Sequence, residues 1–329
     1  MNPAANAECG AMASQTFGKN VFSSTYDPAV FGGWDVRAHD WNFGLSIQQQ
    51  VLPRVSVLAA YNWRWFANFF VTDNRAVTAA DFGTFSITAP TDARLPNGGS
   101  VISGLNDVNA NKFGQVDNYI TKASNYGNQT QNWRGLDLSA NVRLGAGVTF
   151  QGGFSTGRTL TDNCEIVAAL PEILVNGTTI TPAQYCHIED PYRTQVKGLW
   201  SYTVPKIAVQ VSGTFQSSPG ARLAANYNVA NAIIAPSLGR NLSGGANATI
   251  NLVTPATLYG DRINQIDLRA SKILKFGRMR SQISLDLYNV TNSDATQTYN
   301  QTFVLNGAWL TPTLILPARF AKITAQIDF

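Results

Sequence analysis

The chain has 329 residues and a formal net charge of +4, with 13% charged residues and 44% hydrophobic residues. The charged fraction is well below the ~25% of soluble domains, so the composition argues against an ordinary soluble protein. No stretch approaches the ~18 uninterrupted apolar residues of a membrane-spanning helix. No Lys/Arg cluster with interleaved aromatic residues indicates a nucleic-acid partner.

Nine segments alternate polar and apolar residues with period two, which is the pattern of a half-buried strand. In the first segment Trp41, Phe43, Leu45 and Ile47 share one face. Eight of the nine segments have 10–13 residues, about as long as the ~9–11 that a tilted strand needs to cross a bilayer. The nine predicted strands are 41–50, 55–71, 133–144, 148–158, 194–203, 207–217, 263–274, 279–290 and 317–329.

The connections between these segments alternate in length. Short turns lie at 51–54, 145–147, 204–206 and 275–278, whereas long loops run over 72–132, 159–193, 218–262 and 291–316. Transmembrane barrels have short periplasmic turns and long extracellular loops. The sequence therefore predicts an all-β fold, an antiparallel up-and-down transmembrane β-barrel that is partial, with about nine strands. We assign 1–40 to an extracellular loop segment and 41–329 to the barrel.

The alternation also predicts which side chains face lipid. A charge near the middle of the lipid face costs ~2–4 kcal/mol, so charged positions are assigned to the lumen. Aromatic residues near strand ends are interpreted as a girdle: Trp63, Trp65, Phe69, Phe70, Trp133 and Tyr202. We expect lipid contact at Leu136, Leu138, Val209, Val211, Leu285 and Leu287, and a luminal position for Asp137, Asn141, Arg143, Gln210, Asp267, Arg269 and Asp286.

The final strand ends on an aromatic residue, Phe329, with Ile327, Ala325 and Ile323 on the same face. This pattern looks like the C-terminal signal by which outer-membrane barrels are recognised for assembly. It predicts the barrel assembly machinery as a partner.

Residues that carry chemistry are scarce. His39 and His187 are far apart in the sequence, and no nucleophile elbow, zinc-protease or phosphate-loop motif occurs. The alternate spacing of Asp107, Asn109 and Asn111 resembles a calcium loop only faintly, because no bidentate Glu follows, and a solvated loop is favoured. We therefore expect no enzyme activity, no catalytic or metal site and no cofactor.

The three cysteines give one further expectation. Cys164 and Cys186 both lie in the loop between the fourth and fifth predicted strands, and oxidation is plausible in an exported protein. A disulfide there would stabilise the fold by roughly 3 kcal/mol in the chain-entropy model. Two unpaired thiols remain the alternative. Cys9 is left over, either free or paired outside this chain.

Several runs of the chain together resemble the C-terminal barrel of TonB-dependent receptors, in particular the large Oar-like receptors with an N-terminal carboxypeptidase-regulatory-like domain. Order and spacing carry the resemblance, since each run alone is weak. The runs are SLGRNL (237–242), GDRINQIDLR (260–269), DLYNVTNS (286–293), WLTP (309–312), IL (315–316) and ARF (318–320), with NP (2–3), ECG (8–10) and YDP (26–28) near the start.

The resemblance implies a bacterial outer-membrane protein that takes up a nutrient ligand through a plugged barrel of about 22 strands. It implies lipid, the missing N-terminal strands and plug, and TonB as partners. The start of the chain has no basic or apolar region of a signal peptide. Either the signal has been removed along with much more, or the chain is a fragment that begins at an internal Met, and we favour the fragment. The alternatives are a surface protein such as an adhesin, or a complete small barrel.

Overall fold

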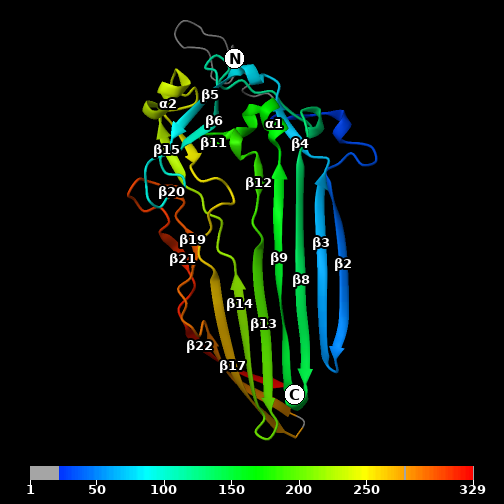
Figure 1. Cartoon of the computed structure of the whole chain (residues 1–329). Coiled ribbons are helices and arrows are strands. Elements are labelled where there is room, and N and C mark those ends of the chain that lie inside the picture. The colour runs from blue at the N-terminus through cyan, green and yellow to red at the C-terminus, as the bar shows by residue number, and fades with distance from the viewer. Residues whose placement is uncertain (1–21, 278, 329) are drawn as a thin grey trace, which may run out of the picture.

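The computed structural model describes residues 22–277 and 279–328, which form one large sheet with shorter elements beyond one end of it (Figure 1). Nine long strands make up the large sheet, and each overlaps one segment that the alternation predicts. They are β2 (His39–Leu52), β3 (Val55–Ala67), β8 (Thr130–Leu144), β9 (Val148–Asp162), β13 (Arg193–Val204), β14 (Val209–Ser218), β17 (Ile263–Phe276), β18 (Met279–Tyr288) and β22 (Phe320–Asp328).

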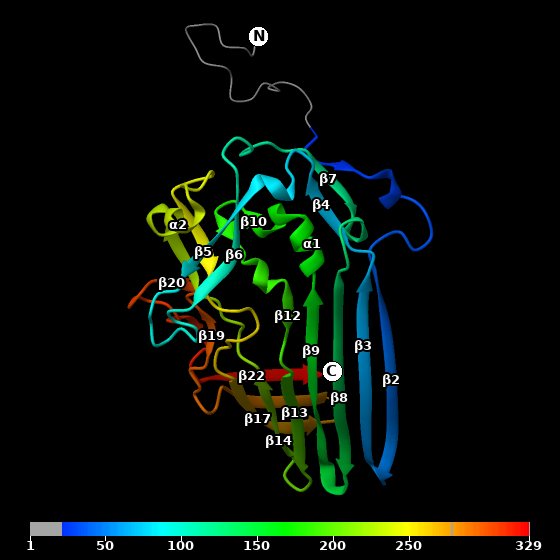
Figure 2. The ribbon, with the colours of Figure 1, turned by 45° about the horizontal axis from the view of Figure 1, so that its top comes forward.

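The long strands form a meander in which each pairs antiparallel with the next one along the chain. Their order is β2-β3-β8-β9-β13-β14-β17-β18-β22, and the short β12 (His187–Glu189) adds to β9. Within the described residues no pairing joins β2 to β22, so the sheet is open rather than a closed barrel. It twists strongly, and β22 runs across the view of Figure 2 while β2 and β3 run along it.

The two faces of this sheet differ in chemistry. Cross-strand partners share a face, so register transfers the assignment from strand to strand. Leu138 is opposite Ala59 and Phe154, and Leu285 is opposite Ala270 and Ile323. The six predicted lipid-facing residues share this face and the seven predicted luminal residues share the other, as predicted. The face that carries Leu138 and Leu285 is called the apolar face, and the other the polar face. The exposed large side chains of the apolar face include Trp41, Phe43, Leu45, Ile47, Tyr61, Trp63, Leu136, Leu138, Phe150, Trp200, Phe215, Ile283, Leu285, Ile323 and Ile327.

Glycines on the apolar face lie under aromatic rings. A Cβ at Gly213 would come within 2.7 Å of Nε1 of its cross-strand partner Trp200, and one at Gly152 within 2.9 Å of the Phe150 ring. These glycines let the rings lie down against the backbone. The ring then supplies the apolar surface that the glycine lacks.

The long connections contain further short strands and two α-helices, which the alternation did not predict. We call their elements the cap. The cap strands are β1 (Thr25–Tyr26), β4 (Phe70–Asn74), β5 (Phe82–Thr88), β6 (Val101–Val108), β7 (Asn118–Lys122), β10 (Val175–Asn176), β11 (Thr179–Ile180), β15 (Asn226–Ala230), β16 (Asn247–Asn251), β19 (Thr296–Tyr299), β20 (Thr302–Phe303) and β21 (Pro312–Ile315), and the helices are α1 (Cys164–Ala169) and α2 (Asn231–Leu238).

Strand pairing in the cap also corrects the prediction of purely antiparallel pairing. Three short pairs are parallel, namely β1 with β7, β11 with β16 and β15 with β20. Each joins segments from different parts of the sequence. Parallel pairs need a long connection, and the intervening long strands and cap segments provide one.

The hydrophobic core lies in the cap. Of the buried hydrophobic side chains in the described residues, none lies on the nine long strands. The largest cluster surrounds β15 and β16 and brings together all the long connections after β3. Its members are Phe85, Ile87, Ala89, Leu95, Ile102, Leu105, Ile180, Ala225, Val229, Ile234, Ala248, Ile250, Leu252, Val253, Phe303 and Trp309.

Two arginines, Arg240 and Arg94, form hydrogen bonds between different connections of the cap. Arg240 follows the left-handed Gly239 that ends α2, and it donates to the Asp107 carboxylate and to the carbonyl of Val108 at 3.0 Å. The predicted solvated loop at Asp107 is therefore wrong, because this aspartate is buried and paired. Arg94 in turn binds Asp92 and the carbonyls of Gly307 and Trp309 at 2.9 and 3.1 Å, joining two connections.

Candidate functional site on the polar face of the sheet

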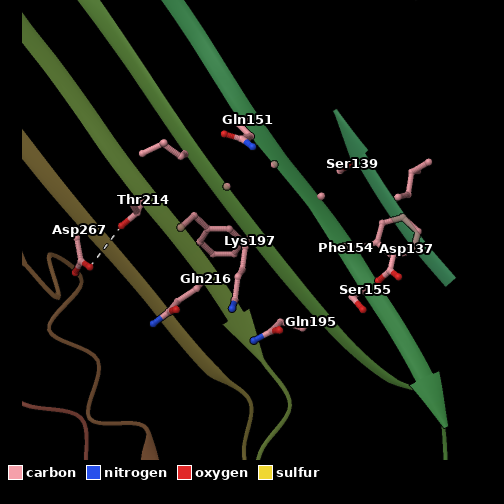
Figure 3. A pocket seen from close by; sticks show the side chains of 16 residues that line it. Asp137, Ser139, Gln151, Phe154, Ser155, Gln195, Lys197, Thr214, Gln216 and Asp267 are labelled. Carbon is pink, nitrogen blue, oxygen red and sulfur yellow. Dashed lines mark hydrogen bonds between the residues drawn. The ribbon is translucent and has the colours of Figure 1, made fainter. Parts of the chain in front are cut away.

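The polar face of the sheet carries a hollow of about 580 Å³ between β8 and β17 (Figure 3). Gly153, which has no side chain, lies in the floor of the hollow, and its cross-strand partners are Ser139 and Lys197. A Cβ at Gly153 would lie 2.1 Å from the carbonyl oxygen of Leu138, so glycine is the residue that this packing accepts. The polar lining includes Asp137, Ser139, Gln151, Ser155, Gln195, Lys197, Thr214, Gln216 and Asp267.

The two carboxylates of this hollow are held by neutral donors. Asn62 donates to Asp137 at 2.7 Å. Asp267 accepts from Gln265 at 3.0 Å, from the backbone N–H of Asn289 at 2.8 Å and from Thr214 at 3.4 Å. Lys197 is exposed and has no ion-pair partner among the residues that the structure describes. The hollow can therefore bind polar solutes by hydrogen bonds and by the Lys197 ammonium group.

Between β17 and β18, polar side chains of this face bond to one another across the strands. Arg269 forms an ion pair with the buried Asp286, and Ser271 and Ser284 share a hydrogen bond of 2.8 Å. A smaller hollow of about 280 Å³ lies beside this pair and shares Thr214 and Asp267 with the larger one. Burying charge on this face is tolerable because the two charges neutralise each other.

A third hollow, of about 470 Å³, lies where the polar face meets the cap. It shares Ser155 and Gln195 with the first hollow, so the two adjoin. Trp133 lies in its wall, against the cross-strand pair Gly135 and Gly157. A Cβ on either glycine would come within 2.5 to 2.6 Å of the Trp133 ring.

The charges around this upper hollow are partly neutralised. Asp190 is buried, pairs with Arg222 and accepts from the Tyr259 hydroxyl at 3.2 Å. Burial and the nearby Asp190 raise the pKa of Tyr259, so its hydroxyl remains a donor. Arg193 lies over the Tyr259 ring at 5.0 Å and donates to the carbonyl of Gly220, yet its buried Nε has no acceptor among the described residues.

The site residues predicted from the sequence lie apart from these hollows. Cys164 and Cys186 form a disulfide, with their Cα atoms 4.8 Å apart, in the connection between β9 and β13. Ile323, Ala325 and Ile327 lie on the apolar face of β22. Phe329, like Cys9, lies outside the described residues. The two histidines are apart, His39 beside Asp35 and His187 beside Asp162.

The predicted aromatic girdle is only partly correct. Trp63, Trp65 and Tyr202 do lie on the apolar face. Trp133 lies on the polar face with Asp137, and Phe69 packs against the cap cluster around Ile166 and Leu170. Strand phase could have placed Trp133, since it is four residues before Asp137. The position of Arg193 in the wall of the upper hollow could not be inferred from the sequence, because it depends on contacts with Tyr259 and Gly220 of the cap.

Comparison of the sequence with protein-family models finds no match, and comparison with curated proteins finds none. Neither α1 nor α2, the two α-helices in the described part of the chain, is long and apolar enough to cross a membrane. No group of three or more His, Cys, Asp or Glu side chains in that part is placed to hold a metal ion.

Proposed function

We propose that this chain is the C-terminal part of the β-barrel of a TonB-dependent receptor in the bacterial outer membrane, where the whole receptor takes up a nutrient. One observation carries the proposal. The nine long strands expose a mainly apolar face, while their buried side chains include Asp286, Ser271 and Ser284 on the opposite face. This distribution is the reverse of a water-soluble sheet and suits lipid outside with a wet lumen inside.

The arrangement of the connections supports the same proposal. All four turns between hairpin partners are short and lie at the end of the sheet away from the cap, as Figure 1 shows. The cap is then the extracellular side. Its size and its polar hollows next to the sheet suit a surface that first meets a solute.

The two free edges support a barrel completed by further strands. An open edge in hydrocarbon leaves backbone N–H and C=O groups without partners, each costing several kcal/mol. Because β2 and β22 stand first and ninth in an antiparallel order, they run in the same direction. A second copy with the same orientation would therefore meet β22 as a parallel partner. An odd number of additional strands closes the barrel with antiparallel pairs, as the remaining ~13 strands of a 22-stranded receptor would.

The alternatives make different demands on the same sheet. A complete small barrel requires β2 and β22 to meet, and they would then pair parallel. An adhesin would use the cap alone and would need no plug or TonB contact. The free edges and the polar hollows favour the receptor over both.

An experiment on the natural polypeptide tests the proposal. An antibody against the β9–β13 connection would detect it in isolated outer membranes, and its mass would be compared with the 35.6 kDa of this chain. The expected polypeptide is much larger and is retained by the immobilised periplasmic domain of TonB. A mature polypeptide of this chain's own mass, or a larger one that this domain does not retain, would overturn the receptor assignment.

A further inference from the structure

We propose that the upper hollow, between the polar face and the cap, is a binding site for a sugar acid. Trp133 would stack on the sugar ring and Arg193 would hold the carboxylate. The site requires no assumption about transport, because it is built from residues of this chain alone.

The first argument is the position of the Trp133 ring. Trp133 comes from β8 and lies against the paired glycines Gly135 and Gly157, which have no side chains to lift it. One face of the indole is therefore supported by backbone, and the ring forms part of the wall of the hollow. An aromatic face laid flat in a polar recess is suited to the apolar face of C–H groups that the chair of a pyranose presents.

The second argument is the guanidinium of Arg193. Its side chain lines the hollow, and within the described residues it donates a hydrogen bond from Nη2 to the carbonyl of Gly220. The Nε is covered by protein atoms, so a solute would meet the terminal nitrogens. A guanidinium has five N–H donors and bonds strongly to a carboxylate. Asp190, which also lines the hollow, already pairs with Arg222, so an acidic ligand would supply the acceptor for the terminal N–H groups.

The third argument is the set of hydroxyl and amide side chains that line the hollow. Ser155, Thr159, Gln195 and Ser218 contribute hydroxyl and amide groups, and Gln195 already donates to Ser218 at 2.9 Å. Such groups can both donate and accept, which matches the hydroxyl groups of a sugar. The volume of about 470 Å³ falls in the usual range for small-molecule sites.

The site adjoins a second polar hollow on the same face of the sheet. It opens beside the first hollow, with which it shares Ser155 and Gln195. Lys197 lies in that next hollow, where no described residue forms an ion pair with it. An acid released from Arg193 would therefore meet a second cation further along the same face.

Isothermal titration of the full chain in detergent with D-glucuronate, D-glucose and acetate tests this site. Glucose lacks the carboxylate and acetate lacks the ring. We expect glucuronate to bind at least about tenfold more tightly than either, since a hydrogen bond to a charged group contributes about one order of magnitude. Absence of saturable glucuronate binding, or equal binding of acetate, would overturn the proposal.

Matched variants separate binding from folding. Trp133→Ala and Arg193→Gln should each weaken glucuronate binding by about tenfold, and Trp133→Phe should retain most of it. Trp200→Ala is the control, because Trp200 also lies on a strand glycine, Gly213, but on the opposite face. Far-ultraviolet circular dichroism checks that each variant keeps its strands. Equal losses in Trp133→Ala and Trp200→Ala would mean that the ring only supports the sheet.

Discussion

The long-strand sheet and the cap place their apolar residues in opposite ways. In the cap, Trp309, Phe303, Ile250 and Val229 are buried, as in a water-soluble domain. On the sheet, Leu285 is exposed while its neighbour Asp286 is buried. The same chain therefore contains one region whose folding needs water outside it and one region whose outward side chains suit lipid.

This contrast shows what each region relies on for stability. The cap gains from removing apolar surface from water, at about 25 cal/mol per Å². The sheet gains mainly from its backbone ladder and from bonded polar side chains such as Ser271 with Ser284. Equivalent substitutions should therefore have different consequences in the two regions.

The largest expected effect is the loss of a cap tryptophan. Trp309 is buried, donates to the carbonyl of Ala224 at 2.9 Å and packs edge-on against Phe303. Trp309→Ala should lower the free energy of unfolding of the cap by about 3–5 kcal/mol. Trp200→Ala on the sheet should cost within about 1 kcal/mol in bilayers. Hydrogen exchange of β15 and β16 measures the first effect, and equal costs would remove the contrast.

Opening the disulfide should cost slightly less. Replacing both Cys164 and Cys186 with Ala removes a link that closes the connection around α1, and we expect a loss of roughly 3 kcal/mol. Thermal unfolding of the cap, with and without a reductant, provides the measurement. Reductant should reproduce the variant's loss in the unmodified chain and leave the variant unchanged. Insensitivity of the unmodified chain would argue against a formed bond.

A single charge should distinguish the two faces of one strand. Leu138→Arg places a cation on the apolar face and should cost about 2–4 kcal/mol in a bilayer. Ser139→Arg places it one residue later on the polar face, and the cost should stay within about 1 kcal/mol. Chemical unfolding from lipid vesicles measures both. A larger cost at Ser139 would reverse the assignment of the faces.

The smallest expected effect concerns pH in the cap. The guanidinium of Arg94 beside Asp92 holds the pKa of that carboxyl well below its usual range. Its stabilising contribution is therefore present above the ordinary pKa of about 4 and is lost as pH falls through the lowered value. Asp92→Asn should weaken the dependence of cap stability on pH below 4, measured by hydrogen exchange. An unchanged dependence would mean that other groups set the acid response.

The sequence predicted the sheet well and the cap poorly, for a physical reason. Alternation with period two is local, so it located nine strands, their facing and their order. The cap core instead joins Phe85, Ile234 and Trp309, which are far apart in the sequence. No local period marks such contacts, and short strands such as β11 carry too few residues to show one. The surroundings of Arg193 could not be predicted for the same reason, because Tyr259 and Gly220, which contact it, belong to a different connection.

The most direct test of the account is the surroundings of four consecutive side chains on β8. Single cysteines at Leu136, Asp137, Leu138 and Ser139, in a background with Cys9→Ser, would carry a fluorescent label in lipid vesicles. Brominated lipid should quench the labels at 136 and 138, and aqueous iodide those at 137 and 139. Uniform quenching by iodide at all four positions, or the reverse alternation, would contradict the assignment of lipid to the apolar face.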